Sequence, residues 1–454
     1  MKPSHIVLVI ILICAVALAG SAVYMSYHGS QTQPPVASPT PNPTVSPTSS
    51  PTPDSTTNAS SSVPLPTGKP RAATNAEITT AVTANNTFTF DLYNRYAGKT
   101  GNIFFSPYSI TTALAMTAEG AKGQTATEMN KVLHVSQSAD SQRTAAASVY
   151  NDLNASGQPF TLNTANALWA EKTYQFLSNY LTLVANYYGG KVTNLDFVGA
   201  AEASRQRINS WVAAQTHNKI TNLIPQGAID GFTRLVLTNA IYFKGTWVLQ
   251  FDKKLTKKAD FHVDDSTTVQ ADMMTLVGEK ALFNYAENSD AQVLQMPYSG
   301  KKLSMVIILP KGNSTATVEG KLNASYVSTL ESTLTNQRVN VYLPSFTFKT
   351  TYGLGDDLQA LGMPTAFDAS KADFSGMDGT TDLYIGAVVH QAFVAVDEEG
   401  TEAAAATAVM IQTSAVMNPK PIPDFRADHP FIFLIQNDST GEILFIGRVT
   451  NPTM

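Results

Sequence analysis

The segment formed by residues 396–431 constrains the fold of this chain of 454 residues more than any other. It opens with three acidic residues and Gly400, and it continues as a run of threonine and alanine. Residues 401–417 include neither proline nor glycine, so each can adopt strand geometry and donate its backbone N–H. Because alternate residues of a strand share a face, one face of such a strand would carry only small side chains: Thr401, Ala403, Ala405 and Thr407.

That face could enter a sheet between two neighbouring strands without requiring new volume in the core beneath it. Alanine, however, has a low strand propensity, and an alanine run is more typical of a helix on the protein surface. From these residues alone, an inserting strand and a surface helix both stay open.

Several stretches of the sequence resemble the serpins, a family of serine protease inhibitors. EEGTEAAAATAV (residues 398–409) resembles the serpin hinge, and ADHPFIFLI (residues 427–435) resembles the strand that follows the reactive loop. Further matches occur in the same order as in the family: FSPYSI with Ser106 and Pro107, NAIYFKGTW with Trp247, and VVHQAF with His390. The resemblance covers residues 75–452 without a large insertion.

The resemblance implies an α+β fold with a large central mixed β-sheet, further antiparallel sheets, about nine helices and an exposed reactive loop. It also implies a function as a serine-type endopeptidase inhibitor. A target protease would cleave the loop, and the freed hinge would insert into the central sheet, so the inhibitor acts as a suicide substrate. The alternative is a non-inhibitory serpin that serves as a binding, carrier or surface-interaction protein. We expect a monomer in either case.

The resemblance also assigns the reactive bond and the hinge. Inhibitory serpins keep a nearly fixed hinge length, which places the bond fourteen residues beyond Gly400, at Ser414–Ala415. Small residues on both sides suit an elastase-like or subtilisin-like protease as the partner, whereas Met410 and Met417 would suit a chymotrypsin-like enzyme. The expected hinge residues are Glu398, Gly400, Thr401, Glu402, Ala403, Ala404, Ala405, Ala406 and Thr407.

Four further residues are expected to be structural, at the places where the strands of the central sheet part: Ser106, Pro107, Trp247 and His390. Ser106 followed by Pro107 is also typical of a helix N-cap and first helical position. His390 lies in an apolar run, where a hydrogen-bonded core histidine is the ordinary interpretation. The resemblance adds that His390 would hydrogen-bond across the parting strands, and that Trp247 would hold the end where they open.

The sequence predicts neither catalysis nor a cofactor. It has no HExxH zinc motif, no GxSxG nucleophile elbow and no phosphate-binding loop after a predicted strand. Asp264–Asp265 and Glu398–Glu399 are pairs of neighbours, which would point to opposite faces of a strand and could not share a proton. We therefore expect no enzyme and no metal site. The net charge of −5 argues against a nucleic-acid partner.

The N-terminal part differs from the rest in composition. Residues 6–23 carry no charge, which is typical of a signal peptide or a single membrane anchor. We expect this segment to comprise residues 1–27, a disordered linker rich in Pro, Ser and Thr to comprise residues 28–74, and the folded domain to comprise residues 75–454. The expected location is extracellular, secreted or anchored at the cell surface. The only cysteine is Cys14, so the domain would contain no disulfide.

Local patterns predict several elements of the domain. Phe88, Leu92 and Tyr96 recur every four residues, which indicates an amphipathic helix. Thr125 and Glu128 have the spacing of a capping box.

Further along the chain, residues 235–247 predict a long apolar strand with a turn at Gly245. Residues 339–348 predict a strand broken by Pro344, and Gly362 is expected to end a helix. Two strands are expected at the C-terminus, at residues 431–436 and 442–449.

Overall fold

The computed structural model describes residues 70–401 and 421–454. Within these residues, ten α-helices accompany three β-sheets, in agreement with the expected α+β fold. The helices are α2 (Asn75–Ala97), α3 (Pro107–Ala118), α4 (Gly123–Val132), α5 (Ala139–Leu153), α6 (Ser178–Tyr188), α7 (Phe197–Gln215), α8 (Ala316–Glu319), α9 (Ala324–Ser332), α10 (Gly355–Leu361) and α11 (Ser375–Asp378).

The central sheet has six strands in the order β12-β13-β14-β4-β2-β3. It is mixed, because β13 pairs with β4 and β2 pairs with β3 in parallel, while the other pairs are antiparallel. Its strands are β2 (Phe160–Glu171), β3 (Lys191–Leu195), β4 (Leu235–Thr246), β12 (Phe346–Gly353), β13 (Ala387–Val396) and β14 (Gly400–Thr401).

The second sheet has seven strands in the order β1-β17-β16-β9-β8-β7-β10. They are β1 (Ile103–Phe105), β7 (Leu282–Glu287), β8 (Ala291–Pro297), β9 (Leu303–Pro310), β10 (Thr335–Arg338), β16 (Phe431–Asn437) and β17 (Ile443–Val449). The third sheet has the order β15-β11-β6-β5 and comprises β5 (Lys257–His262), β6 (Thr268–Leu276), β11 (Asn340–Pro344) and β15 (Asp424–Arg426). The two C-terminal strands expected from the sequence are β16 and β17.

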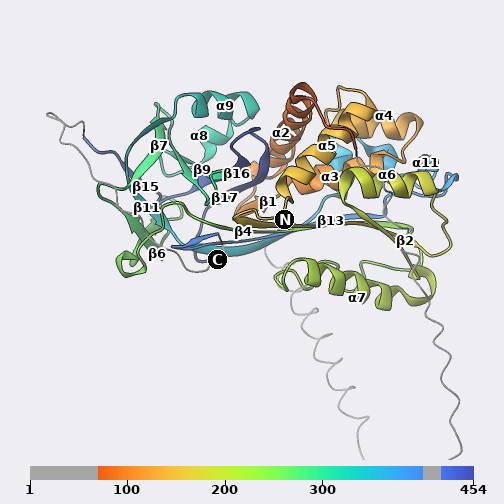
Figure 1. The fold of residues 1–454 in the computed structure, drawn as a ribbon. Helices are drawn as coiled ribbons and strands as arrows, with labels where there is room; N and C mark the ends of the chain where they lie inside the picture. The colour runs from red at the N-terminus through yellow and green to blue at the C-terminus, as the bar shows by residue number, and fades with distance from the viewer. Residues whose placement is uncertain (1–69, 402–420) are drawn as a thin grey trace, which may run out of the picture. The chain divides into compact units, whose positions relative to one another are not determined.

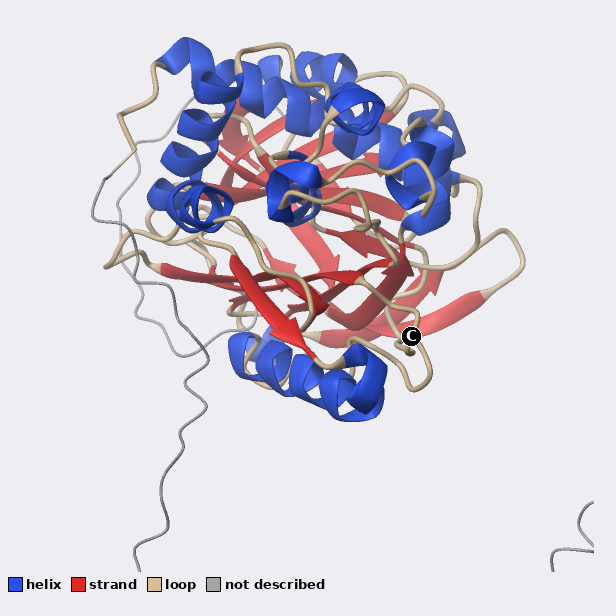
Figure 2. Ribbon diagram, turned by 90° about the vertical axis from the view of Figure 1, so that its right-hand side faces the viewer, coloured by secondary structure: helices blue, strands red, loops and turns tan. Residues whose placement is uncertain are grey.

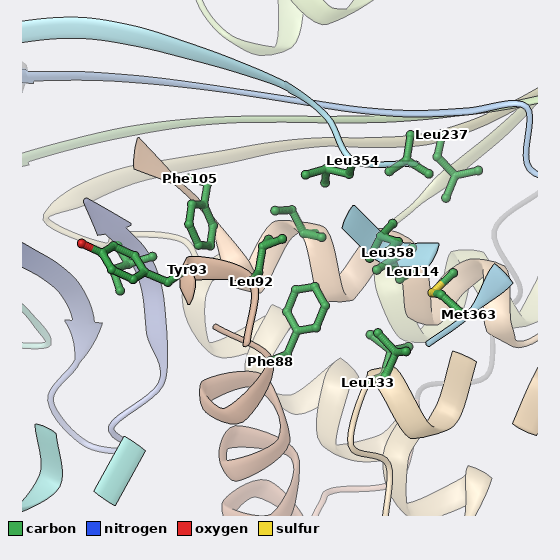
Figure 3. Packing of buried hydrophobic residues seen from close by; sticks show 14 of the residues in the cluster. Phe88, Leu92, Tyr93, Phe105, Leu114, Leu133, Leu237, Leu354, Leu358 and Met363 are labelled. Atoms are coloured by element: carbon green, nitrogen blue, oxygen red, sulfur yellow. The ribbon is translucent and has the colours of Figure 1, made fainter. Parts of the chain in front are cut away.

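Helices cover both faces of the central sheet (Figures 1 and 2). On one face α7 packs alone, with Trp169 of β2 and Val236 of β4 in contact with Ile208 and Val212 of the helix in one apolar cluster. The larger helical layer lies on the opposite face and includes α2, α3, α5 and α6 (Figure 1). The core beneath that layer joins residues of α2, such as Phe88, to residues of α3, α10 and β4 (Figure 3).

Of two helix starts predicted from local sequence, one is confirmed and one is wrong. Ser106 caps α3, its side chain accepting from the N–H of Ser109, and Pro107 occupies the first helical position, as predicted. The predicted capping box at Thr125 and Glu128 is wrong, because α4 begins at Gly123 after Lys122 and no side chain caps it.

The side chains of Thr125 and Glu128 form hydrogen bonds with residues far away in the sequence instead. The Thr125 hydroxyl accepts from the N–H of Asp373, and the Glu128 carboxylate accepts from the N–H and the hydroxyl of Thr365. Tertiary hydrogen bonds therefore replace the local cap.

Of two strand predictions, the turn at Gly245 is wrong and the break at Pro344 is confirmed. Gly245 does not form a turn: β4 continues through it to Thr246, because the missing side chain leaves room for the rings of Phe243 and Tyr298. The strand predicted at residues 339–348 is divided at Pro344 into β11 and β12, which belong to different sheets. The helix expected to end at Gly362 is α10.

The predicted signal or anchor at residues 1–27 and most of the predicted linker at residues 28–74 lie outside the described residues. In the part of the chain that the structure describes, no helix combines the length and the apolar character that a membrane crossing requires.

Candidate functional site at the hinge of the central sheet

The two middle strands of the central sheet are paired at one end and separated at the other. Residues 387–392 of β13 pair directly with residues 236–241 of β4. Further along, β14 lies between them: Thr401 pairs with Val396 of β13 and with Gly245 of β4, and Gly400 pairs with Thr246. Two of the expected hinge residues, Gly400 and Thr401, therefore already occupy the sheet, a feature that the sequence alone left open.

Thr401 points into the core. Only 2% of the residue is exposed, and its hydroxyl lies 2.7 Å from the hydroxyl of Tyr298. The ring of Tyr298 stacks on the indole of Trp247 with a centroid separation of 4.5 Å, and burial raises the pKa of Tyr298. Tyr298 follows an apolar strand and was not singled out in the sequence, because nothing local marks it as the partner of Thr401.

Gly400 is required by the closeness of β4. A Cβ atom at this position would lie 2.0 Å from the carbonyl oxygen of Gly245 and 2.7 Å from Cα of Thr246. Any other residue would push the hinge away from β4.

The turn that joins β13 to β14 is held by Trp247. Its indole N–H donates to the carbonyl of Asp397 at 3.0 Å, and its backbone N–H donates to the carbonyl of Glu399 at 2.9 Å. The Asp397 carboxylate in turn accepts from the N–H groups of Glu399 and Gly400. Trp247 therefore packs its indole in the core and also stabilises the hinge turn by donating two hydrogen bonds to it.

The two acidic pairs lie in turns and not in strands, so the expectation that they point to opposite faces of a strand is wrong. Glu398 accepts from the hydroxyl of Thr256 at 2.7 Å, and Glu399 pairs with the Lys253 ammonium at 2.6 Å. Asp264 and Asp265 lie in the bend between β5 and β6. Glu398 and Glu399 have separate partners, an arrangement unlike that of two carboxylates sharing a proton.

A buried polar cluster joins β13 to β4 where the two strands pair directly. His390 is fully buried, and its Nδ1 hydrogen-bonds to the side-chain oxygen of Asn239 on β4. Its Nε2 accepts from the backbone N–H of Ser106 at 3.1 Å, so the ring proton resides on Nδ1 and donates to Asn239. Burial lowers the pKa of His390 to about 3, and the ring is neutral at physiological pH.

The cluster continues into α3 and β2. The side-chain amide of Asn239 donates to the Asn166 oxygen at 2.6 Å and to the Ser109 hydroxyl at 2.5 Å, and Ser109 donates to the same Asn166 oxygen. Ser106 donates to the carbonyl of Leu444 at 2.6 Å. Sequence reasoning named Ser106 but missed Asn166, Asn239 and Ser109; an asparagine inside an otherwise apolar strand was the available signal.

The remaining predicted site residues, Glu402 to Thr407 and the bond Ser414–Ala415, lie outside the described residues, and their roles stay predictions. Within residues 70–401 and 421–454, no group of three or more His, Cys, Asp and Glu side chains is arranged to hold a metal ion.

Comparison with known proteins connects this geometry to a family. The family model described as "Serpin (serine protease inhibitor)" matches residues 83–452. An uncharacterised serpin-like protein of Thermococcus kodakarensis is 43% identical over 390 residues, covering 86% of this chain and 89% of the relative. Leukocyte elastase inhibitor of Equus caballus is 40% identical, covering 82% and 99% of the two chains.

Among solved structures, human thyroxine-binding globulin in complex with thyroxine superimposes with a TM-score of 0.76 at 32% identity, covering 83% of this chain and all of the other. The match of the family model over most of the chain and the identity to these relatives agree with the fold described above. The chain belongs to the serpin family.

Proposed function

We propose that this protein inhibits a serine protease as a suicide substrate, by inserting its cleaved reactive loop between β13 and β4. The observation that carries the proposal is the position of Thr401, already seated between these strands with its side chain in the core. The inserting strand therefore has its first residues in register before cleavage.

The pairing of β14 indicates where the rest of the hinge would go. Thr401 pairs with Gly245 and Val396, and both pairings are antiparallel. Continued without a bulge for six residues, both registers bring Thr407 to the same place, opposite Asn239 on one side and His390 on the other. Those two residues are direct partners in the resting sheet, so insertion to Thr407 would replace the bond between them.

The same registers explain the small inward face of the hinge. Ala403 would lie between Phe243 and Val394, and Ala405 would lie between Ile241 and Ala392. All four flanking residues are buried in one apolar cluster. Since packed interiors do not accept extra volume cheaply, alanine at these positions allows the strand to enter, whereas a large residue would not fit.

The chemistry is that of an interrupted serine protease reaction. The protease serine attacks the carbonyl carbon of Ser414 and forms an ester, while the amine of Ala415 leaves as a new N-terminus. Ser414 lies thirteen positions after Thr401; as a strand this distance is about 43 Å. Full insertion would carry the ester past Leu235, where β4 begins, and inhibition requires this movement to outrun hydrolysis of the ester.

The energetics favour insertion once the loop is cut. The resting sheet joins β13 and β4 through six residue pairs. An inserted strand would give up those pairs and gain hydrogen-bonded pairing on both of its edges, with apolar side chains added to the core. Before cleavage, the loop is connected to the chain at both ends and cannot insert fully. The uncut state therefore persists because of this connection, and not because its free energy is lower than that of the inserted form.

The likeness to leukocyte elastase inhibitors and the small residues around Ser414 support an elastase-like or a subtilisin-like target. The apolar run at residues 6–23 supports export, with the domain secreted or held at a cell surface. A carrier function without insertion is the second candidate, favoured by the similarity to thyroxine-binding globulin.

The test is incubation with a panel of serine proteases, followed by denaturing gels. We expect an elastase-like or subtilisin-like enzyme to give a complex that survives denaturation, and a released fragment that begins at Ala415. If every protease in the panel only cuts the loop and no covalent band appears, the inhibitor function is wrong and the carrier function gains support.

A further inference from the structure

A cavity of about 60 Å³ lies among the helices of the larger helical layer, away from the hinge residues described above. Helices α2, α3, α5 and α6 contribute to its walls, and Glu442 of the turn between β16 and β17 lines it as well. One water needs roughly 10 to 15 Å³ by this measure. The space therefore suits a molecule of about four or five non-hydrogen atoms.

Glu442 is the unusual part of this wall. Only 5% of the residue is exposed, and its Oε2 atom is buried without a hydrogen-bond partner in the described structure. Buried carboxyl oxygens are seldom left unpaired, because the hydration lost on burial is then not replaced by another hydrogen bond. The position of Glu442 in the wall means that a ligand could supply the missing partner.

The groups around Glu442 add negative and aromatic character. Tyr108 of α3 is buried, and burial raises the pKa of its hydroxyl. The charges of Glu442 and Tyr150 raise this pKa further. Burial raises the pKa of Glu442 to about 8, and the negative charge of Asp152 on α5 adds to this effect. Tyr187 and Tyr188 of α6 also line the cavity.

No lysine, arginine or histidine is among the described residues of the lining. The nearby cations are engaged elsewhere: Lys302 is bonded to Asp152 at 2.6 Å, and Arg143 is paired with Glu119 at 2.6 Å. An anion would therefore find no positively charged partner in the cavity. A cation would find a carboxylate and several tyrosine side chains, and aromatic rings attract positive charge.

We propose that this cavity is a binding site for a small organic cation of the primary ammonium class, held by the carboxylate of Glu442 among the tyrosine rings. The site is independent of the protease-inhibitor function, because it involves neither the loop nor the strands that part.

The proposal has a consequence for pH. In the free protein the Glu442 carboxyl is protonated at pH 7, since its pKa is about 8. Binding of an ammonium ion requires the carboxylate, so it releases about one proton at this pH. About 1% of the group is ionised at pH 6 and about half at pH 8, so the affinity should be about 50-fold higher at pH 8.

The experiment is calorimetric titration of the full-length protein with n-propylammonium chloride at pH 6, 7 and 8, in buffers with different heats of ionisation. We expect saturable binding that strengthens with pH and releases a proton. Glu442→Gln should weaken binding at least tenfold and remove its pH dependence. The matched control is Glu331→Gln, because Glu331 is a partly buried carboxyl with a raised pKa that already accepts from Gln436 and does not line the cavity.

A second variant covers the case in which Glu442→Gln fails to fold. Ala146→Leu, on the α5 wall, should fill part of the cavity and weaken binding while Glu442 stays in place. The proposal is overturned if 1-propanol, which has the same size and no charge, binds equally well, or if potassium chloride gives the same heat. It is also overturned if propylammonium shows no saturable binding at any pH, or binds Glu442→Gln as tightly as the original protein.

Discussion

The hinge end and the middle of the central sheet are built differently, although the same two strands form both. At the hinge end β13 and β4 are separated by β14, which pairs with both strands. Gly400 lies close against β4, and Thr401 is hydrogen-bonded to Tyr298. In the middle the strands pair directly, and a polar cluster around His390 and Asn239 joins them.

Under the proposed mechanism, the hinge end would stay in place and the middle would be the region that opens. The hinge end is fastened by contacts that a further inserted residue would not disturb, because Trp247 and Tyr298 lie beside β14 and not in its path. In the middle, the side chains of His390 and Asn239 are joined by a hydrogen bond, which under the proposed mechanism the hydroxyl of Thr407 would replace with hydrogen bonds of its own. Hydrogen bonds exchanged for equivalent ones cost little net free energy, whereas interlocked apolar side chains would resist separation.

The largest expected effect comes from a charge on the inward face of the hinge. Thr401→Arg would bury an unpaired guanidinium beside Tyr298, which costs several kcal/mol or forces the hinge out of the sheet. We expect the loop to be cut as readily as before while inhibition is lost, measured as the number of inhibitor molecules consumed per protease.

The matched control for Thr401→Arg is Glu402→Arg. Residue 402 lies outside the described residues, and strand alternation predicts that its side chain faces away from the core. An equal loss of inhibition by both variants, or no loss by Thr401→Arg, would argue against insertion.

The next effect tests the close approach at Gly400. Gly400→Ala would place a Cβ atom 2.0 Å from the carbonyl oxygen of Gly245, so we expect destabilisation of about 1–3 kcal/mol and more rapid proteolysis at the hinge turn. Gly353→Ala is the control in the same sheet, because no atom lies within 4 Å of its added Cβ. Similar melting temperatures for the two variants would show that β14 is not seated as described.

The middle of the sheet should respond to acid. His390 has a pKa of about 3 in the folded protein, below its ordinary value of 6.5, so the unfolded or opened state binds more protons between these values. The stability that a neutral His390 provides is present above pH 6.5 and declines by up to about 1.4 kcal/mol for each unit of pH below it.

The measurement is the melting temperature between pH 7 and pH 4, compared with that of His390→Gln. The variant should lose less stability across this range than the original protein, since glutamine does not titrate. If the melting temperatures of the two proteins fell equally with pH, His390 would be protonated at little cost in folding free energy. The cluster would then not stabilise the contact between β13 and β4.

The smallest effect is expected at Trp247. Trp247→Phe keeps a ring to stack on Tyr298 but removes the donor to the carbonyl of Asp397, and one such hydrogen bond contributes about 1 kcal/mol. We expect a small fall in melting temperature and faster amide exchange at Glu399 and Gly400, with the amides around His390 unchanged. Exchange that rises equally at both places would contradict the separation of the two regions.

Much of this organisation follows from local sequence. Ser106 and Pro107 begin a helix because their own side chains set its start, and the small inward face of the hinge follows from strand alternation. The resemblance to serpins then predicted the central sheet. Tyr298 could not be predicted, because its role depends on a contact with Thr401 more than a hundred residues away.

Two failures have the same cause. Thr125 and Glu128 have the spacing of a capping box, but Asp373 and Thr365 compete for them. Gly245 carries a turn signal, yet it lies in β4, where its missing side chain makes room for two rings. How far the hinge enters the sheet at rest was also beyond the sequence, because it depends on the pairing of β14 with β4, which lies far away in the sequence.

The central claim is that cleavage lets the loop become a strand between β13 and β4, and the melting temperature before and after cleavage tests it most directly. A protease that cuts the loop without being trapped would provide the cleaved form, and Thr401→Arg cut in the same way would provide the control. We predict that cleavage raises the melting temperature of the original protein by tens of degrees, with a much smaller rise for the variant. An unchanged or lower melting temperature after cleavage at Ser414–Ala415 would contradict insertion.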